Sequence, residues 1–475
     1  MTSTAPEGAG TMRTYRKLST PLAGLLTASV LVTGGCSRED LLSVNTPDQL
    51  QVVEGNSPAG ATALRAAAVG NFNNFYSGTT LMGVVLYVGV LSDELINARP
   101  GGEHLDIRAF NPNVFPNRPW ENFSNAYTQI IRATGALQEY GAPGATRNTQ
   151  IGNLLALRGF ATTLVGELFC NGVPLSDVAD VRGEQPTTTT VTTTQLYEQS
   201  IRAFDSALAV LGTTGADVNQ RYLARIGKAR ALVNLNRQAE AATVVGAGGD
   251  GAGSIAVPSN FVFRSSHSQT SNAHGVYDWM VGTANFGPSE REGGNGLNFR
   301  SADDPRVVIG STFRLGQDGS TQVYTIAGYP NGNASSDIAT GVEARLIEAE
   351  AALKAGQVGA FLAALNAPRA DAAVRASRLV PISTDPAVLP PLTDPGTPEG
   401  RVDLLFRERA FWLYLTAHRV GDLRRLVRQY GRNSETVWPT GAYFKGGVYG
   451  TDQNLIPMGT ELTNPNWTAC TDRNA

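Results

Sequence analysis

Helical patterns that recur in pairs are the feature that most constrains how this chain can fold. Apolar residues repeat at helical spacing near 61–75, 120–139, 153–245 and 341–370, with loops rich in Gly, Pro, Asn and Thr between them. Pairs of helices with a repeat of about 34 residues are typical of tetratricopeptide-like arrays. We therefore expect a mainly α fold, a tetratricopeptide-like helical superhelix of about four hairpins.

Two long stretches, 77–118 and 246–340, do not follow this pattern. They are dense in Gly, Asn, Asp and aromatic residues, which predicts long loops with short strands. Loops of this length inside a compact domain are usually functional. The sequence therefore predicts helical hairpins packed against a loop-rich half with short strands.

One further long helix is expected near the C-terminus, over 402–419. It carries apolar residues on one face: Leu404, Phe411 and Leu415. We assign Trp412 on this helix, and Trp120 on the helix near 120–139, to helix cores.

The N-terminus has the order of residues that a secretory signal peptide requires. A basic start precedes an apolar run that is too short to span a bilayer, and small residues then lead to Cys36. Small residues before a cysteine resemble a bacterial lipobox, although Thr33 stands where Leu is usual. We expect residues 1–35 to be a signal peptide, with Met12 as an alternative start. Cys36 would then be acylated and 36–50 would form a tether.

The composition after the signal peptide favours one folded domain over 51–475. Apolar residues make up 42% of the chain, which is ample for a core, and no later segment could span a membrane as a helix. The net charge of −3 gives no reason to expect a nucleic-acid partner. Cys170 and Cys470 can pair in an oxidising compartment or remain free thiols, and the sequence does not decide between the two.

No catalytic or metal-binding constellation is recognisable. The four histidines are scattered, and the chain has no HExxH, Gly-x-Ser-x-Gly or CxxC. Residues 246–251 spell GxGxxG, but they follow a helical pattern and precede an extended one, whereas a dinucleotide site needs strand, turn and then helix. We expect no enzyme activity, no cofactor and no metal. A glycoside hydrolase whose carboxylates meet only on folding is the alternative that remains open.

Five short motifs occur in a fixed order along the mature chain. The strongest is Glu408-Arg409-Ala410 with Leu413, His418-Arg419 and Asp422-Leu423-Arg424-Arg425. The others are Leu41-Leu42-Ser43-Val44, Leu157-Arg158 through Gly172-Val173-Pro174-Leu175, Arg345 through Ala351, and Ile456-Pro457 with Asn464-Pro465. Together they resemble the SusD/RagB family of outer-membrane nutrient-binding lipoproteins, with a C-terminal signature over 401–467. The resemblance covers nearly the whole mature chain.

The strongest motif also departs from the family's pattern. Trp412 and Thr416 stand where glutamates are usual, and Ala417 stands where glycine is usual. The resemblance therefore implies a divergent branch, whose fold transfers more directly than its ligand. Within the motif, Asp422 can accept hydrogen bonds from an arginine. We interpret His418 as part of an ion-paired helix terminus in preference to a general base or metal ligand.

The resemblance implies capture of a nutrient at the cell surface. The chain would be lipid-anchored in the outer membrane, facing the exterior. It would bind a glycan or other oligomeric nutrient, such as a peptide, and hand it to a TonB-dependent SusC-like transporter. The alternative is a helical-repeat lipoprotein that acts as a protein-interaction scaffold without binding glycans.

The two loop stretches supply the candidate ligand-binding residues. Aromatic rings stack on the apolar faces of sugars, while amides and guanidinium groups reach the hydroxyls. The candidates, chosen from this chemistry and from their position in the loops, are Asn97, Arg99, Asn111, Phe115, Tyr277, Trp279 and Arg300. For each aromatic residue, packing of a loop onto the core is an equally good interpretation.

Overall fold

The computed structural model describes most of the chain after the expected tether. The described residues are 56–79, 82–101, 103–109, 118–176, 188–251, 253–378, 389–457, 461, 464, 465, 467 and 469–471. All of them belong to one compact unit, residues 51–475. The signal peptide, the lipidation site at Cys36 and the tether over 36–50 lie outside the described residues.

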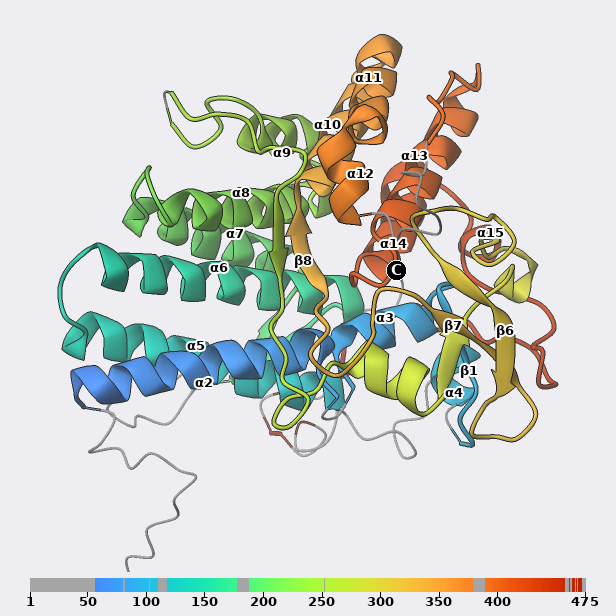
Figure 1. Ribbon diagram of the computed structural model, residues 1–475, viewed down its shortest axis with the longest axis horizontal. Coiled ribbons are helices and arrows are strands. Elements are labelled where there is room, and N and C mark those ends of the chain that lie inside the picture. Colours follow the sequence, from blue (N-terminus) through green and yellow to red (C-terminus); the bar gives the residue numbers. More distant parts are fainter. Residues whose placement is uncertain are drawn as a thin grey trace, which may run out of the picture. The chain divides into compact units, whose positions relative to one another are not determined.

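A stack of helices accounts for the repeats that the sequence predicts (Figure 1). Consecutive members of the stack pack against one another. In chain order they are α2 (Pro58–Ser77), α5 (Arg118–Tyr140), α6 (Ala145–Leu168), α7 (Thr193–Val210), α8 (Asp217–Asn234), α9 (Gln238–Val245), α10 (Gly341–Lys354) and α11 (Val358–Ala370). The mainly α, tetratricopeptide-like fold is therefore confirmed.

Local sequence explains where several of these helices begin. Ser57 caps α2, because its hydroxyl accepts a hydrogen bond from the Gly60 N–H at 3.0 Å, and Pro58 occupies the first turn. At the start of α7, Thr192 and Gln195 form a reciprocal capping box. These caps satisfy N–H groups that a helix start otherwise leaves unpaired.

Two glycines allow three helices of the stack to approach closely. A Cβ atom at Gly159 of α6 would lie 2.6 Å from the ring of Phe204, and one at Gly227 of α8 would lie 2.3 Å from it. The ring of Phe204, on α7, is fully buried. It therefore packs directly against the backbones of both neighbouring helices.

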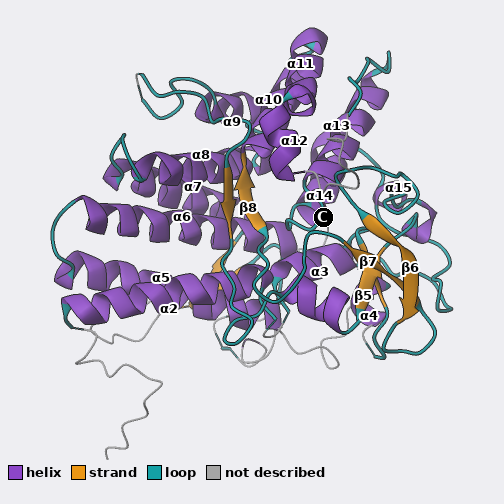
Figure 2. Ribbon diagram, viewed as in Figure 1, coloured by secondary structure: helices purple, strands orange, loops and turns teal. Residues whose placement is uncertain are grey.

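The loop-rich half that the sequence predicts carries short strands and helical turns (Figure 2). The strands are β1 (Leu95–Asn97), β2 (Val173–Ser176), β3 (Thr188–Val191), β4 (Val262–Arg264), β5 (Phe286–Pro288), β6 (Ile309–Leu315), β7 (Gln322–Ile326) and β8 (Asp337–Thr340). In the described part of the chain they pair as antiparallel two-stranded sheets, β1 with β5, β2 with β3, β4 with β8 and β6 with β7. The short helical turns are α4 (Glu103–Asp106), η1 (Tyr277–Gly282), η2 (Glu292–Gly294), α12 (Ala372–Arg378) and α15 (Ser434–Val437).

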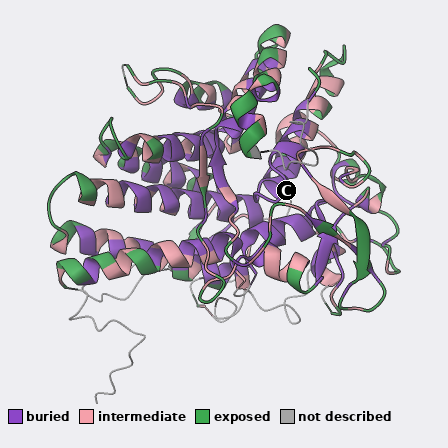
Figure 3. Cartoon of the chain, viewed as in Figure 1, coloured by how far each residue is buried: buried purple, intermediate pink, exposed green. Residues whose placement is uncertain are grey.

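The stretch 77–118 contains a helix where only loops and strands were predicted. This helix, α3 (Val84–Leu91), consists entirely of buried residues, and Figure 3 shows it in the interior. A helix buried on all sides has no polar face and therefore no helical period in its sequence. Its β-branched, apolar run is indistinguishable by pattern from a buried strand.

The prediction of one long helix over 402–419 is wrong, because the helix ends within this range and a second one follows. The two helices are α13 (Pro398–Trp412) and α14 (Arg419–Tyr430). Residues 413–417 form turns, with positive φ angles of 52° at Leu415 and 59° at Ala417. Such angles are unfavourable for residues with side chains and must be held by their surroundings.

Buried polar groups from distant elements hold this break. The Glu94 carboxylate accepts a hydrogen bond from the Leu415 N–H at 3.2 Å. Tyr76 donates to the Thr416 carbonyl at 3.0 Å, and Arg230 donates to the Ala417 carbonyl at 2.6 Å. The break is thus stabilised by tertiary contacts that no local pattern contains.

The charged residues of the C-terminal motif are buried and paired. Arg409 and Asp422 form two hydrogen bonds of 2.8 and 2.9 Å between α13 and α14. Nε2 of His418, immediately before α14, lies 3.0 Å from the Glu343 carboxylate on α10. His418 therefore lies at a helix terminus in contact with a buried carboxylate, the position that the interpretation requires.

Two tryptophans assigned to helix cores are buried as expected. Trp120 on α5 is 3% exposed and Trp412 on α13 is 2% exposed. Among the described residues, no helix combines the length and the apolar character that crossing a membrane would need.

A disulfide bond joins Cys170 to Cys470, with 5.9 Å between their Cα atoms. Cys170 follows α6, so the bond ties the C-terminal segment to the end of a helix of the stack. Nearby, the Trp467 indole N–H donates to the Gly172 carbonyl at 2.8 Å, and the Thr471 N–H donates to the Asn171 carbonyl at 2.8 Å.

Candidate functional site

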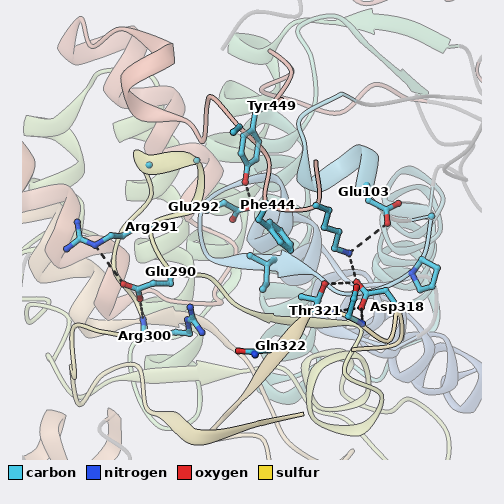
Figure 4. Close-up of a pocket in the computed structure, with 18 residues that line it drawn as sticks. Glu103, Glu290, Arg291, Glu292, Arg300, Asp318, Thr321, Gln322, Phe444 and Tyr449 are labelled. Atoms are coloured by element: carbon cyan, nitrogen blue, oxygen red, sulfur yellow. Dashed lines mark hydrogen bonds and ion pairs between the residues drawn. The ribbon is translucent and has the colours of Figure 1, made fainter. Parts of the chain in front are cut away.

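A cavity of about 970 Å³ lies in the loop-rich half (Figure 4). Its lining comes from four segments that are far apart in the sequence, within 96–103, 290–300, 318–322 and 442–449. We call this cavity the loop pocket. Its volume is in the range of small-molecule binding sites.

Pairing of short strands brings these segments together. Leu95 and Asn97 of β1 pair with Pro288 and Phe286 of β5 in an antiparallel arrangement, so the two strands lie side by side, and residues that follow each strand line the pocket. The turn between β6 and β7, together with the first residue of β7, supplies 318–322. A hairpin closed by the bridge between Ala442 and Val448 supplies the fourth segment, which we call the C-terminal hairpin.

Gly293 permits the closest approach between two of these segments. Its φ is +59°, and a Cβ atom there would lie 2.4 Å from the Thr440 backbone nitrogen. A side chain at this position would therefore push the segment at 290–294 away from the chain that leads into the C-terminal hairpin.

Two carboxyl groups and two tyrosines fix the C-terminal hairpin to the pocket wall. Tyr443 donates a hydrogen bond to Asp106 at 2.6 Å, and Tyr449 donates to Glu292 at 3.1 Å. Asp106 and Glu292 are themselves hydrogen-bonded to each other and are almost fully buried. In Figure 4, Tyr449 reaches down to Glu292 at the pocket.

This acid pair retains a proton. Burial raises the pKa of Asp106 to about 6. Burial, and then the neighbouring Asp106 charge, raise the pKa of Glu292 well above its usual range. Because two adjacent buried carboxyls cannot both ionise cheaply, a shared proton near neutral pH holds the pair together.

Lys445 of the C-terminal hairpin lines the loop pocket and contacts two acidic side chains. Its ammonium is 2.7 Å from Asp318 and 3.8 Å from Glu103. Asp318 also accepts hydrogen bonds from the Thr321 N–H and hydroxyl at 2.8 and 2.6 Å. Burial alone would raise the pKa of Asp318, but the hydrogen bonds from Lys445 and Thr321 outweigh it and lower that pKa.

Glu290 organises the segment that carries Arg300. Its carboxylate accepts hydrogen bonds from the backbone N–H groups of Arg300 at 3.1 Å and Ser301 at 2.9 Å. The Ser301 hydroxyl donates a third at 2.5 Å. The guanidinium of Arg300 lies over the ring of Tyr324, with 4.5 Å between its central carbon and the ring centroid.

Exposed apolar side chains lie on the two hairpins that supply residues to the loop pocket. Phe444 of the C-terminal hairpin is 50% exposed and lines the pocket. On β6 and β7, Phe313 is opposite Tyr324 and Leu315 is opposite Gln322, so these four side chains share one face of the hairpin. Phe313 and Leu315 are 50% and 55% exposed.

The loop pocket combines features of a binding site for a polar oligomer. Aromatic rings at its rim can stack on ligand rings, and carboxylates, guanidinium groups and amides can reach hydroxyls. Among the residues that the structure describes, no group of three or more His, Cys, Asp or Glu side chains is arranged to hold a metal ion.

The structure places one of the predicted ligand residues, Arg300, in the loop pocket. Asn97 lies next to the pocket on β1 but is fully buried, and its amide bonds the Arg99 backbone at 2.9 and 3.2 Å. Asn111 and Phe115 lie outside the described residues.

Three other predicted residues gather at a different place. The Arg99 guanidinium lies 5.6 Å from the ring centroid of Trp279, whose indole N–H donates to the Thr79 carbonyl at 3.2 Å. Tyr277 is half-buried two residues earlier in η1. None of these three lines the loop pocket.

The C-terminal hairpin was missed by sequence reasoning. Three of the four pocket segments lie in the stretches predicted as functional loops, but 442–449 lies in the part assigned to the family signature. A signal was present, since Tyr443-Phe444 and Val448-Tyr449 flank Lys445-Gly446-Gly447 in the manner of a hairpin turn.

The Gly-rich run 246–251 follows helix α9 and precedes residues without regular structure. Arg225 donates to the Val244 carbonyl at 2.7 Å, and Arg221 pairs with Asp250 at 2.7 Å. Its helix-before-loop context is the one expected, which differs from that of a dinucleotide site.

Comparisons with known proteins place the fold. No protein-family model matches the chain, and no curated protein matches it significantly by sequence. Many solved structures match it by fold. A SusD-like carbohydrate-binding protein from Bacteroides fragilis is similar with a TM-score of 0.58 and 14% identity, covering 88% of this chain and 95% of that one.

Two further structures extend this similarity. A laminarin-binding SusD-like protein matches with a TM-score of 0.52 and 14% identity, covering 80% of this chain and 95% of that one. A putative sugar-binding protein from Bacteroides vulgatus matches with a TM-score of 0.55 and 16% identity, covering 88% and 99%. The fold implied by the sequence resemblance is therefore confirmed, and the chain has a SusD-like fold.

Proposed function

We propose that this chain, a divergent protein with a SusD-like fold, captures a glycan in the loop pocket without converting it. The observation that carries the proposal is the loop pocket itself, in which the half-exposed ring of Phe444 stands beside a polar interior. The solved structures of similar fold include proteins described as carbohydrate-binding and laminarin-binding. That description supports the same ligand class here.

The physical argument rests on how sugars bind. A pyranose ring offers an apolar face to an aromatic side chain and hydroxyls around its edge. Phe444 is half exposed, so a ligand can cover its ring without any rearrangement of the core. Gln322, Arg300 and the carboxylates provide donors and acceptors for the hydroxyls.

We also propose an outer-membrane location and a transporter partner. The lipobox-like segment before Cys36 supports acylation and a lipid anchor. The resemblance to the SusD/RagB family supports a surface-facing position and transfer of the ligand to a TonB-dependent SusC-like barrel. Extraction of membranes with a mild detergent, followed by purification of the acylated protein, tests this. If no outer-membrane barrel co-purifies, the proposed transporter partner is contradicted.

The binding proposal is tested with protein that lacks residues 1–36. Polysaccharides and peptides are screened by affinity gel electrophoresis and calorimetry, and the same samples are analysed for products. We expect one glycan class to be retained without cleavage. Glu292 has the raised pKa that a general acid requires, so the appearance of shorter products would overturn the binding-only proposal in favour of a glycoside hydrolase.

A matched pair of variants locates the site. Phe444→Ala should weaken glycan binding about two- to tenfold, because stacking on an aromatic ring contributes roughly 0.5–1.5 kcal/mol. Ile255→Ala is the control, since Ile255 is 63% exposed and does not line the loop pocket. If both variants bind the glycan equally well, the glycan site does not include Phe444 and must lie outside the loop pocket. No binding of any glycan or peptide would favour the protein-interaction scaffold.

A further inference from the structure

Arg300 lines the loop pocket, and its guanidinium forms no ion pair with an acidic side chain in the described part of the chain. Its guanidinium carbon lies 4.5 Å from the centroid of the Tyr324 ring, and its Nε atom is buried without a hydrogen-bond partner among the described residues. The residue is half-buried, so only part of its head can be hydrated. A guanidinium that lies over an aromatic ring and has donors to spare is suited to a ligand that offers two oxygens.

The neighbouring acidic groups are already engaged. Glu290 lies next to Arg300, but its oxygens accept hydrogen bonds from two backbone N–H groups and the Ser301 hydroxyl. Asp318 is paired with Lys445 and with Thr321. Glu292 is hydrogen-bonded within the acid pair. These contacts leave the side-chain donors of Arg300 for a ligand.

A second cation stands on the same side of the pocket. Arg291 lines the loop pocket, and its side chain is 68% exposed. Its contact with Glu290 is long, at 3.8 Å. In Figure 4, Arg291 and Arg300 lie on either side of Glu290, so both guanidinium groups are on one wall.

From this arrangement, which presupposes that the loop pocket is the glycan site, we infer that its ligand is an acidic glycan. A sugar carboxylate would bind Arg300 on the wall that also carries Arg291. A carboxylate satisfies two guanidinium donors at once, whereas a neutral hydroxyl satisfies one and leaves the charge uncompensated. Uronic acids carry such a carboxylate on the pyranose ring, and a sulfate ester offers similar oxygens.

The test uses pairs of oligosaccharides that differ only in charge. Oligogalacturonate, oligomannuronate and glucuronoxylan fragments are each compared with their methyl-esterified forms by calorimetry, using protein without residues 1–36. A sulfated galactan and its desulfated form make a separate arm. We expect at least one uronate to bind about tenfold or more tightly than its ester, with an affinity that falls as salt rises. If only the sulfated galactan bound more tightly than its uncharged form, the assignment of a sugar carboxylate as the bound group would be overturned.

Two variants assign the effect to Arg300. Arg300→Gln should abolish the preference for the acid over its ester while retaining affinity for the ester. Arg401→Gln makes the same change of charge in a surface pair with Asp394 outside the pocket, and should leave the preference intact. Thermal unfolding of both variants checks that each is folded. A preference that survives Arg300→Gln would overturn the inference.

The outcomes separate this inference from the function it rests on. Equal binding of the acids and their esters, or binding of neutral glycans only, would overturn the acidic ligand while the glycan-binding proposal stands. Failure of every charged and neutral glycan to bind would overturn both.

Discussion

Glu94 shows how a single buried side chain can control a distant part of the chain. It is fully buried before β1, and its carboxylate accepts the Leu415 N–H at the break between α13 and α14. Burial raises the pKa of Glu94 to about 8, although the Arg419 charge opposes the rise. The folded protein therefore keeps a proton that the unfolded chain loses near pH 4.5.

Replacement of Glu94 with glutamine should change how stability depends on pH. As pH rises from about 4.5 to about 8, the unfolded chain releases its proton while the folded chain retains it, so the wild type loses stability across this window. Each pKa unit corresponds to about 1.4 kcal/mol. Glu94→Gln removes this loss and retains an acceptor for Leu415. The variant should match the wild type near the acidic end and be more stable by up to about 5 kcal/mol above the window.

Urea unfolding of both proteins at a series of pH values measures the difference. Parallel stability curves for Glu94→Gln and the wild type would show that Glu94 is ionised in the folded protein.

At the scale of elements, helix α13 offers two arginine–aspartate pairs with the same two-bond geometry. Arg409 and Asp422 pair at 2.8 and 2.9 Å in the interior, whereas Arg401 and Asp394 pair at 2.7 and 2.8 Å on the surface. A buried pair loses far more than a surface pair when one partner is removed, because the remaining charge is left in a poorly solvated site.

Arg409→Gln should therefore lower the free energy of unfolding by about 3–5 kcal/mol. Arg401→Gln should leave it nearly unchanged, because water solvates both partners. Chemical denaturation of the two variants gives the comparison. Similar losses in both would mean that the position in α13, and not burial, determines the effect.

Elements could be predicted where one face of a helix is buried and the other is solvated. The stack from α2 to α11 has this pattern, and its helices occur near the predicted ranges. Helix α3 lacks it because every residue is buried. The break after Trp412 could not be predicted, since Tyr76, Glu94 and Arg230 stabilise it from distant parts of the sequence.

At the scale of the whole molecule, the site was harder to predict than the fold. Arg300 was found because it lies in a polar, aromatic-rich loop. Tyr443 and Tyr449 were missed because their hydrogen-bond partners are far away in the sequence. Asp106 is 337 positions from Tyr443, and Glu292 is 157 positions from Tyr449. Hydrogen bonds across such separations leave no periodic trace in a single sequence.

The disulfide bond should contribute substantially to the stability of the whole molecule. Cys170 and Cys470 are 300 positions apart, so their bond restricts the unfolded chain strongly. The double variant Cys170→Ala, Cys470→Ala should lose about 2–5 kcal/mol of unfolding free energy. Calorimetry of the variant, and of the wild type with and without reductant, measures the loss. If the variant, the reduced wild type and the oxidised wild type all have the same melting temperature, the disulfide bond does not contribute to stability.

That bond also closes a covalent ring that runs from Cys170 to Cys470. Three of the four pocket segments, at 290–300, 318–322 and 442–449, belong to the ring, while the segment at 96–103 belongs to the arm that enters it. A single peptide bond cut in an exposed loop of the ring would create two new chain ends without releasing a fragment. The nicked protein would migrate as one band in gel electrophoresis until the disulfide is reduced. The pocket segments would remain covalently joined, because the disulfide would connect the two pieces of the chain.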